Sequence, residues 1–166
     1  MKGLATFVTS IDLPEHTRDR TIELLNQQLA DTFDLYSQTK QAHWNVKGVH
    51  FIQLHLLFDT LAEEVFEYID KIAERATALG GLATGTARMA AAASRLPELP
   101  LDVVDGIPVV EELCVRYSDL ATSTRAAIKT AADWGDADTA DLFTAQSRLL
   151  DKSLWFLQAH LQGENH

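Results

Sequence analysis

Apolar residues recur every three or four positions through four long stretches of this chain, and this spacing restricts the chain to a helical fold. In the first stretch the apolar stripe includes Ile22, Leu25, Leu29 and Phe33. An α-helix brings residues at these intervals onto one face, so each stretch predicts an amphipathic helix that buries its apolar side. The four helices are expected at about residues 17–45, 51–79, 109–128 and 136–161.

The connections between the predicted helices indicate how they are arranged. Thr17 or Thr21 is expected to cap the first helix. The segment 82–108 is too long for an ordinary bundle loop, and its Ala-rich part, 86–96, predicts a short extra helix before Pro97. Two helical pairs joined by one long connection are typical of an all-α, ferritin-like four-helix bundle.

Length and composition are those of one domain that lies outside membranes. We expect the helical domain of this 166-residue chain to span 17–162, between short tails at 1–16 and 163–166. The sequence has no apolar run after a basic start and no apolar stretch of about 18 residues, so we expect a cytoplasmic protein without a membrane span. Cys114 is the only cysteine, which excludes an internal disulfide and a thiolate cluster.

The chain is acidic, with a formal net charge of −10. This balance disfavours a surface that grips phosphates throughout, because nucleic-acid binding depends on Lys and Arg. An acidic protein attracts cations, although many acidic proteins have no metal function. The charge therefore leaves a metal-binding function open without establishing one.

Five side chains with nitrogen or oxygen donors form a pattern that ordinary helix design does not require: His43, His55, Asp59, Asp70 and Glu74. The last four lie on the second predicted helix, within a sector about 100° wide. Asp70 nevertheless lies eleven residues beyond Asp59. This separation is about 16 Å along the helix axis, far more than the ~2 Å length of a metal–ligand bond. One helix therefore cannot close a site around a single metal.

A second copy of the same helix would close the site if it packed antiparallel across a two-fold axis, with the His55 end of one chain against the Glu74 end of the other. Taken singly, the donors have other interpretations: His43 could be a core histidine, and the carboxylates could form a solvated face. Phe66 lies in the same sector and would then be left in water, which favours a covered face. Covered charges need partners, and mixed imidazole and carboxylate donors suit iron(II), with zinc and manganese as the nearest alternatives.

Longer motifs surround these donors. They are QAHWNVKG at 41–48, the residues Phe51, His55 and Asp59, DKIAER at 70–75, and, on the last predicted helix, DTAD at 138–141 and DKSLWF at 151–156. Together they resemble the Dps family, the ferritin-like proteins that bacteria accumulate in starvation and under oxidative stress. The resemblance covers nearly the whole chain and implies a hollow homododecamer with two ferroxidase centres at each two-fold interface.

The resemblance also implies the ligands and the reaction. In the pattern of the family, His43, His55 and Asp59 come from one subunit, and Asp70 and Glu74 come from its neighbour. Such an enzyme oxidises iron(II), preferentially with hydrogen peroxide, and stores iron(III) as a mineral, which protects the cell from oxidative stress. Carboxylate ligands favour the harder iron(III), which agrees with this reaction.

Further residues acquire possible roles from the resemblance. Trp44 is expected close to the centre, either as an electron donor or as a core or interface aromatic. Asp136, Asp138 and Asp141 open the last helix, where carboxylates also cap the helix and meet its dipole, and we expect them at a three-fold pore through which cations enter. Glutamates that could face the cavity and seed the mineral are Glu63, Glu64 and Glu67.

The terminal segments differ from the lysine-rich tails with which many members of the family bind DNA. Residues 1–16 contain only Lys2 as a basic residue, and Arg18 and Arg20 follow at the start of the first helix. We therefore expect DNA binding, and with it association with the nucleoid, to be weak or absent.

Two other functions remain as alternatives. One is an architectural dodecamer that condenses DNA, which would require binding that weakens steeply with salt. The other is a shared site that holds zinc structurally at the interface. Metal analysis of protein purified without added metal, together with an iron(II) oxidation assay, distinguishes these possibilities.

Overall fold

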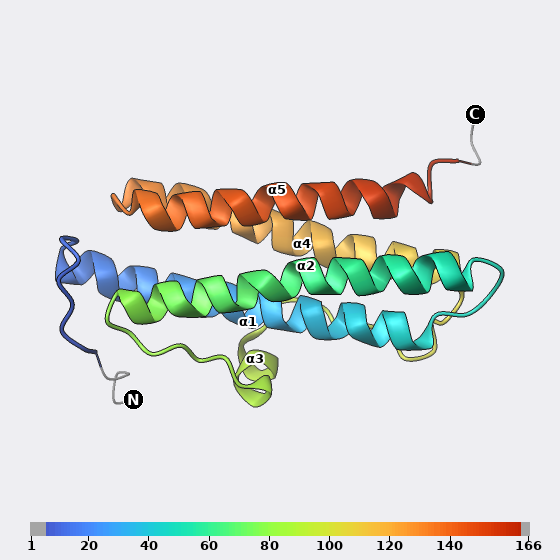
Figure 1. The fold of residues 1–166 in the computed structure, drawn as a ribbon, viewed down its shortest axis with the longest axis horizontal. Coiled ribbons are helices and arrows are strands. Elements are labelled where there is room, and N and C mark those ends of the chain that lie inside the picture. The colour runs from blue at the N-terminus through green and yellow to red at the C-terminus, as the bar shows by residue number, and fades with distance from the viewer. Residues whose placement is uncertain (1–5, 164–166) are drawn as a thin grey trace.

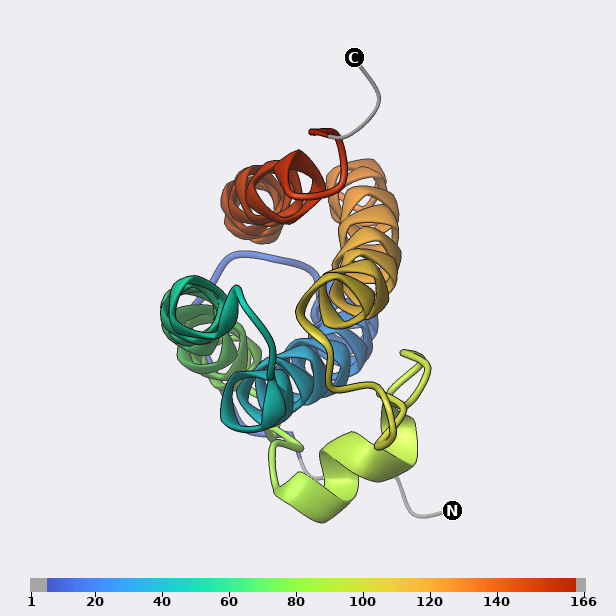
Figure 2. The ribbon, with the colours of Figure 1, turned by 90° about the vertical axis from the view of Figure 1, so that its right-hand side faces the viewer.

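Four long helices form a bundle, and a short fifth helix lies on its outside. In the computed structural model, which describes residues 6–163, the long helices are α1 (Glu15–Asn45), α2 (Phe51–Ala78), α4 (Gly106–Asp133) and α5 (Ala137–Ala159). The short helix is α3 (Ala87–Ala93), in the long connection between α2 and α4. Helix α1 packs along α2, and α4 packs along α5 (Figure 1). Viewed end-on, α3 lies against the outer side of α1 (Figure 2), which confirms the predicted all-α bundle with its extra helix.

Helix α1 begins earlier than the sequence predicts. Pro14 occupies the N-cap position, and its carbonyl oxygen accepts hydrogen bonds from the backbone N–H groups of Thr17 and Arg18 at 2.9 and 3.0 Å. Thr17 and Thr21 are buried within the helix, so the prediction that one of them caps it is wrong. Proline suits the start of a helix because its ring fixes φ and it has no N–H group to satisfy. The helix therefore starts at Glu15, before the expected domain start at position 17.

The connection between α1 and α2 places the candidate site. Residues 46–50 reverse the chain, with Gly48 at φ +98°, a conformation that glycine adopts without strain. The backbone N–H of Lys47 donates a 2.8 Å hydrogen bond to the carbonyl of Val104, which ties this turn to the segment before α4. As a result, the last turns of α1 lie against the first turns of α2.

The long connection is fixed to α1 by polar contacts around α3. Helix α3 is shorter than the predicted 86–96, and the Thr86 hydroxyl caps it by accepting a 3.3 Å hydrogen bond from the Met89 backbone N–H. Beyond α3, the guanidinium of Arg95 donates two hydrogen bonds, at 2.6 and 2.9 Å, to the buried carboxylate of Asp31. The segment that leads to α4 is therefore held against the middle of α1.

A layer of buried polar side chains separates two apolar clusters in the core. The Gln146 amide on α5 donates to the Thr32 hydroxyl on α1 at 2.8 Å, and the Thr32 hydroxyl donates to the backbone carbonyl of Gln28 at 2.7 Å. On α4, the Thr124 hydroxyl donates to the side-chain oxygen of Gln28 at 3.3 Å. Unpaired polar groups are costly in a core, so these bonds favour one register of α1 against both helices of the second pair.

Candidate metal centre

Two histidine rings from neighbouring helices form the centre of the candidate site. The rings of His43 on α1 and His55 on α2 are stacked, with centroids 3.8 Å apart and an interplanar angle of 19°. Nδ1 of His43 lies 2.7 Å from the backbone oxygen of His55, and Nδ1 of His55 lies 2.8 Å from the backbone oxygen of His43. A carbonyl oxygen only accepts hydrogen bonds, so each Nδ1 donates and carries the proton. With Nδ1 as the donor, Nε2 is the ring atom that a metal would bind.

A carboxylate and an ammonium group lie beside this histidine pair. Oδ1 of Asp59 is 3.8 Å from Nε2 of His43 and 2.5 Å from Nζ of Lys40. The hydrogen bond from Lys40 is the main cause that holds the pKa of Asp59 below its usual range; desolvation opposes it, and the charges of His43, Lys40 and His55 add to the lowering. Asp59 is therefore ionised at neutral pH and provides a negative oxygen donor next to the two imidazoles.

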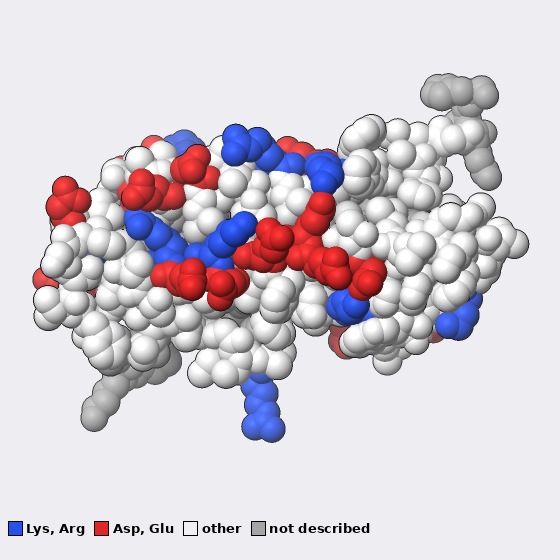
Figure 3. Space-filling model, in the orientation of Figure 1, with Lys and Arg blue, Asp and Glu red and all other residues white. Residues whose placement is uncertain are grey.

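The remaining two predicted donors lie apart from this cluster. Asp70 and Glu74 are exposed on the same continuous helix as Asp59, and Asp70 is about 16 Å further along its axis. Within residues 6–163, no group of three or more His, Cys, Asp or Glu side chains is arranged to hold a metal ion. The structure thus brings together His43, His55 and Asp59, a cluster called the half-site below, and leaves Asp70 and Glu74 apart from it. Figure 3 shows acidic side chains along α2, with basic groups between them.

The face of α2 that carries the four donors also carries apolar side chains in water. Ile52, Leu56 and Phe66 are each more than half exposed, and their helical positions fall in the same sector, about 100° wide, as the donors. Phe66 has one aromatic neighbour, Tyr36, with ring centroids 5.2 Å apart. Large apolar groups gathered on one exposed face are typical of a surface that another protein covers.

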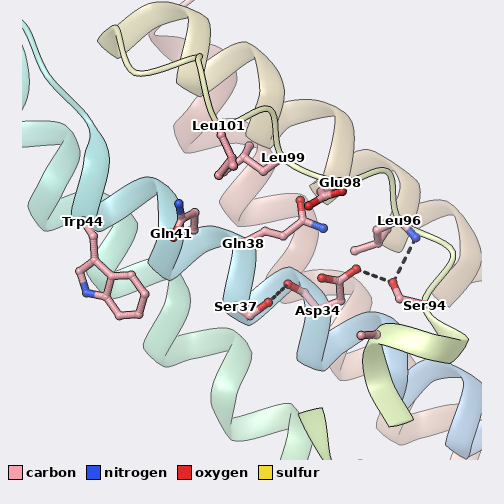
Figure 4. Close-up of a pocket in the computed structure, with 11 residues that line it drawn as sticks. Asp34, Ser37, Gln38, Gln41, Trp44, Ser94, Leu96, Glu98, Leu99 and Leu101 are labelled. Carbon is pink, nitrogen blue, oxygen red and sulfur yellow. Dashed lines mark hydrogen bonds between the residues drawn. The ribbon is translucent and has the colours of Figure 1, made fainter. Parts of the chain in front are cut away.

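Trp44 projects from α1 into a surface groove, and its ring is not part of the half-site. The residue is 62% exposed and helps to line a pocket of about 610 Å³ between α1 and the connection 94–101 (Figure 4). Its ring centroid lies 6.0 Å from Nζ of Lys40. The indole is therefore linked to the half-site through Lys40.

Comparison of the sequence with known proteins identifies the family. Residues 22–165 match the ferritin-like domain family. Over 162 residues the chain is 43% identical to the DNA protection during starvation protein of Agrobacterium fabrum, an alignment that covers 98% of this chain and 100% of that protein. The chain belongs to the Dps family. The family predicted from the motifs around His43 is thus confirmed.

Solved Dps structures share the fold over almost the whole chain. The archaeal Dps homologue of Halobacterium salinarum has a TM-score of 0.91 at 27% identity, covering 99% of this chain and 92% of its own. DpsC from Streptomyces coelicolor has a TM-score of 0.90 at 33% identity, covering 98% of this chain and 95% of its own. The Dps protein of Vibrio cholerae, described as a member of a broad superfamily of ferritin-like diiron-carboxylate proteins, has a TM-score of 0.87 at 27% identity, covering 98% and 100%. The predicted ferritin-like fold is confirmed.

The three aspartates that the Dps resemblance assigns to a pore have different surroundings. Asp136 is buried and caps α5: its Oδ1 accepts hydrogen bonds from the Thr139 N–H at 3.0 Å and from Arg75 at 2.7 Å, and its Oδ2 accepts one from the Thr139 hydroxyl at 2.7 Å. Asp138 and Asp141 are exposed. Of the three aspartates, Asp136 therefore caps the helix, as the alternative interpretation predicts. Only the carboxylates of Asp138 and Asp141 are accessible to a cation from solvent.

The glutamates expected to seed mineral occupy one stretch of α2 and differ in their contacts. Glu63 is exposed, Glu67 lies 3.4 Å from the ammonium of Lys71, and one oxygen of Glu64 accepts a 2.6 Å hydrogen bond from Lys152 on α5. Their role as nucleation sites stays a prediction.

Of the three basic residues considered for DNA contact, Arg18 and Arg20 interact with other groups of the chain, and Lys2 lies outside the described residues. Lys2 precedes the described range. The Arg18 guanidinium donates a 2.7 Å hydrogen bond to the Leu13 carbonyl, and the Arg20 guanidinium stacks on the Trp134 ring at 4.7 Å. As for membranes, no helix within residues 6–163 combines the length and apolar character needed to cross one.

Sequence reasoning missed two basic residues that organise these sites. Lys40 stands three residues before His43, the spacing that places both on one face of a helix, and this spacing could have revealed it. Arg75 was treated as part of a motif, yet it links the end of α2 to Asp136 at the start of α5. No local sequence signal reports that contact, because the two residues are 61 positions apart.

Proposed function

We propose that this chain is the subunit of an iron-storing ferroxidase whose substrates are iron(II) and hydrogen peroxide. The observation that carries the proposal is the pair of rings of His43 and His55, which hold each other through Nδ1 and leave Nε2 for a metal beside the ionised Asp59. Imidazole and carboxylate donors together suit iron(II), and zinc or manganese could substitute for it. The diiron-carboxylate description of the Vibrio cholerae relative supports the same metal.

The proposed centre is completed by Asp70 and Glu74 of a second copy, related by a two-fold axis. On one chain these carboxylates are too far along α2 to reach the histidines. An antiparallel arrangement of two α2 helices would bring them to the half-site of the neighbour and produce two equivalent centres. It would also cover Ile52, Leu56 and Phe66, which a single chain leaves exposed. Repeated in a closed shell, this contact gives the homododecamer of the proposal.

In the proposed reaction, two iron(II) ions each lose one electron, and one hydrogen peroxide molecule takes up both. With two further water molecules the products are two iron(III) oxyhydroxide units and four protons, so atoms and charge balance. The histidines bind the incoming iron(II), and the carboxylates favour the more highly charged iron(III). Both reagents of hydroxyl-radical formation are consumed, which is the proposed protection against oxidative stress.

Other residues receive supporting roles in the same proposal. Asp138 and Asp141 form the cation entrance at the exposed start of α5, and Glu63 and Glu67 seed the mineral from the exposed side of α2. Trp44, in its open groove next to Lys40, is the proposed electron donor. The protein is proposed to act in the cytoplasm.

The test is iron(II) oxidation by hydrogen peroxide, followed by iron(III) absorbance in protein purified without added metal. The variant His55→Ala should oxidise iron at least about tenfold more slowly, because it removes a donor from a site with few ligands. His160→Ala is the matched control, because that ring also has Nδ1 2.8 Å from a backbone oxygen but is exposed just after the end of α5. Tightly held zinc in the purified protein, with no protein-dependent iron oxidation, would refute the ferroxidase and favour the structural zinc site.

A further inference from the structure

The ammonium of Lys40 pairs with the same Asp59 oxygen atom that lies near Nε2 of His43. Its Nζ lies 2.5 Å from Oδ1 of Asp59, and Nε2 of His43 lies 3.8 Å from the same oxygen atom. A cation bound by the His43 nitrogen and by this oxygen would enter the space next to the ammonium. The side chain of Lys40 is only 21% exposed, so the ammonium is held at the half-site and does not extend into solvent.

The ammonium of Lys40 has a second possible interaction partner, the Trp44 ring. The Trp44 ring follows one turn later on α1, with its centroid 6.0 Å from Nζ. An aromatic face at that distance attracts an ammonium group. The indole is 62% exposed and lines an open groove. When the ammonium leaves Asp59, it can therefore still interact favourably with the Trp44 ring.

We propose that Lys40 is a built-in counter-ion, which pairs with Asp59 until a metal displaces it toward Trp44. This inference rests on the proposed function, because it assumes that the half-site binds a divalent metal. It assigns a regulatory role: the lysine lowers the affinity of the half-site, so that a metal is retained mainly where the partner subunit's Asp70 and Glu74 add their charge. A carboxylate oxygen has room for a metal and a hydrogen bond together, but an ammonium and a divalent ion at the same oxygen repel each other at close range.

The expected effect follows from the exposure of the pair. Breaking a partly exposed ion pair changes an equilibrium constant by up to about fivefold. Removal of the repulsion between the ammonium and the metal adds to this, with partial screening by solvent. Loss of the charge at Lys40 should therefore tighten metal binding about tenfold.

The test uses cobalt(II), which binds imidazole and carboxylate donors and reports its coordination in the visible spectrum. The assembled full-length protein is titrated by calorimetry and by absorbance. Lys40→Met keeps most of the length of the side chain and removes the charge. Lys129→Met is the matched control, because its ammonium is also 2.5 Å from an aspartate, Asp133, in an exposed pair on α4. Lys40→Arg keeps the charge.

Lys40→Met should bind cobalt(II) about tenfold more tightly than the original protein, whereas Lys129→Met and Lys40→Arg should stay within about threefold. A Lys40→Met affinity equal to that of Lys129→Met would overturn the inference. If the original protein still oxidised iron in that case, the proposed function would stand without it. Absence of cobalt binding in every variant would overturn both. Crystals loaded with zinc(II) should show Nζ of Lys40 nearer to the Trp44 ring than to Asp59, and an unchanged pair would contradict displacement.

Discussion

Mixing two inactive variants should restore about a quarter of the original activity if the centre is shared between chains. His55→Ala removes the histidine half, and the double variant Asp70→Ala, Glu74→Ala removes the carboxylate half, about 16 Å away along α2. In a random equal mixture, about half of the two-fold pairs contain one chain of each kind. Each such pair has one centre with both halves intact and one with both halves damaged. About one centre in four is therefore complete.

The assay compares initial rates of peroxide-dependent iron(II) oxidation after the two proteins are dissociated, mixed and reassembled. Recovery should be greatest at equal proportions and fall toward zero at either extreme. A mixture of His43→Ala and His55→Ala is the control, because both changes damage the same half and no pairing can repair it. Absence of recovery in the first mixture, or equal recovery in the control, would refute a centre that is divided in this way.

Three further predictions address stability, reactivity and DNA. Asp136→Ala should destabilise the fold by about 3 kcal/mol in thermal unfolding, because it removes the cap of α5 and the buried ion pair with Arg75. Asp138→Ala, at an 85% exposed side chain 3.9 Å from Arg75, should change stability by less than about 0.5 kcal/mol. Burial raises the pKa of the Cys114 thiol to about 11 from 9.0. Alkylation at pH 8 should therefore be about a hundredfold slower than for an unperturbed thiol, because less thiolate is present. An alkylation rate near that of a free thiol would contradict the burial. Plasmid DNA should show little or no retention in gel electrophoresis near neutral pH and physiological salt without divalent cations, because the net charge is −10 and the Arg18 guanidinium is hydrogen-bonded to the Leu13 carbonyl. A shift of the DNA band at submicromolar protein would contradict this prediction. Loss of that shift in Lys2→Ala would locate the contact.

Periodic spacing predicts the helices of this chain well, and chemistry predicts the candidate donors. The apolar stripe through Leu25 and Leu29 and the Ala-rich segment before Pro97 each correspond to a helix in the structure. The predicted start of α1 is wrong, because threonine is a common helix cap but Pro14 occupies the N-cap position here. Spacing places Lys40 on the face of His43, but it does not identify Asp59 as its partner, nor Asp136 as the partner of Arg75, because both contacts depend on how separate helices pack.

The polar layer inside the bundle has a consequence for where chemistry can take place. Its members, Gln28, Thr32, Thr124 and Gln146, are amides and hydroxyls, and none of them titrates or carries charge. Other helix bundles place carboxylates and histidines at such inward positions and hold metals there. Here the layer fixes helix register, while the candidate metal donors lie outside it, on α1 and α2. Substitutions in the core can therefore alter the stability of the subunit while leaving the metal donors unchanged, so selection can act on the two properties separately.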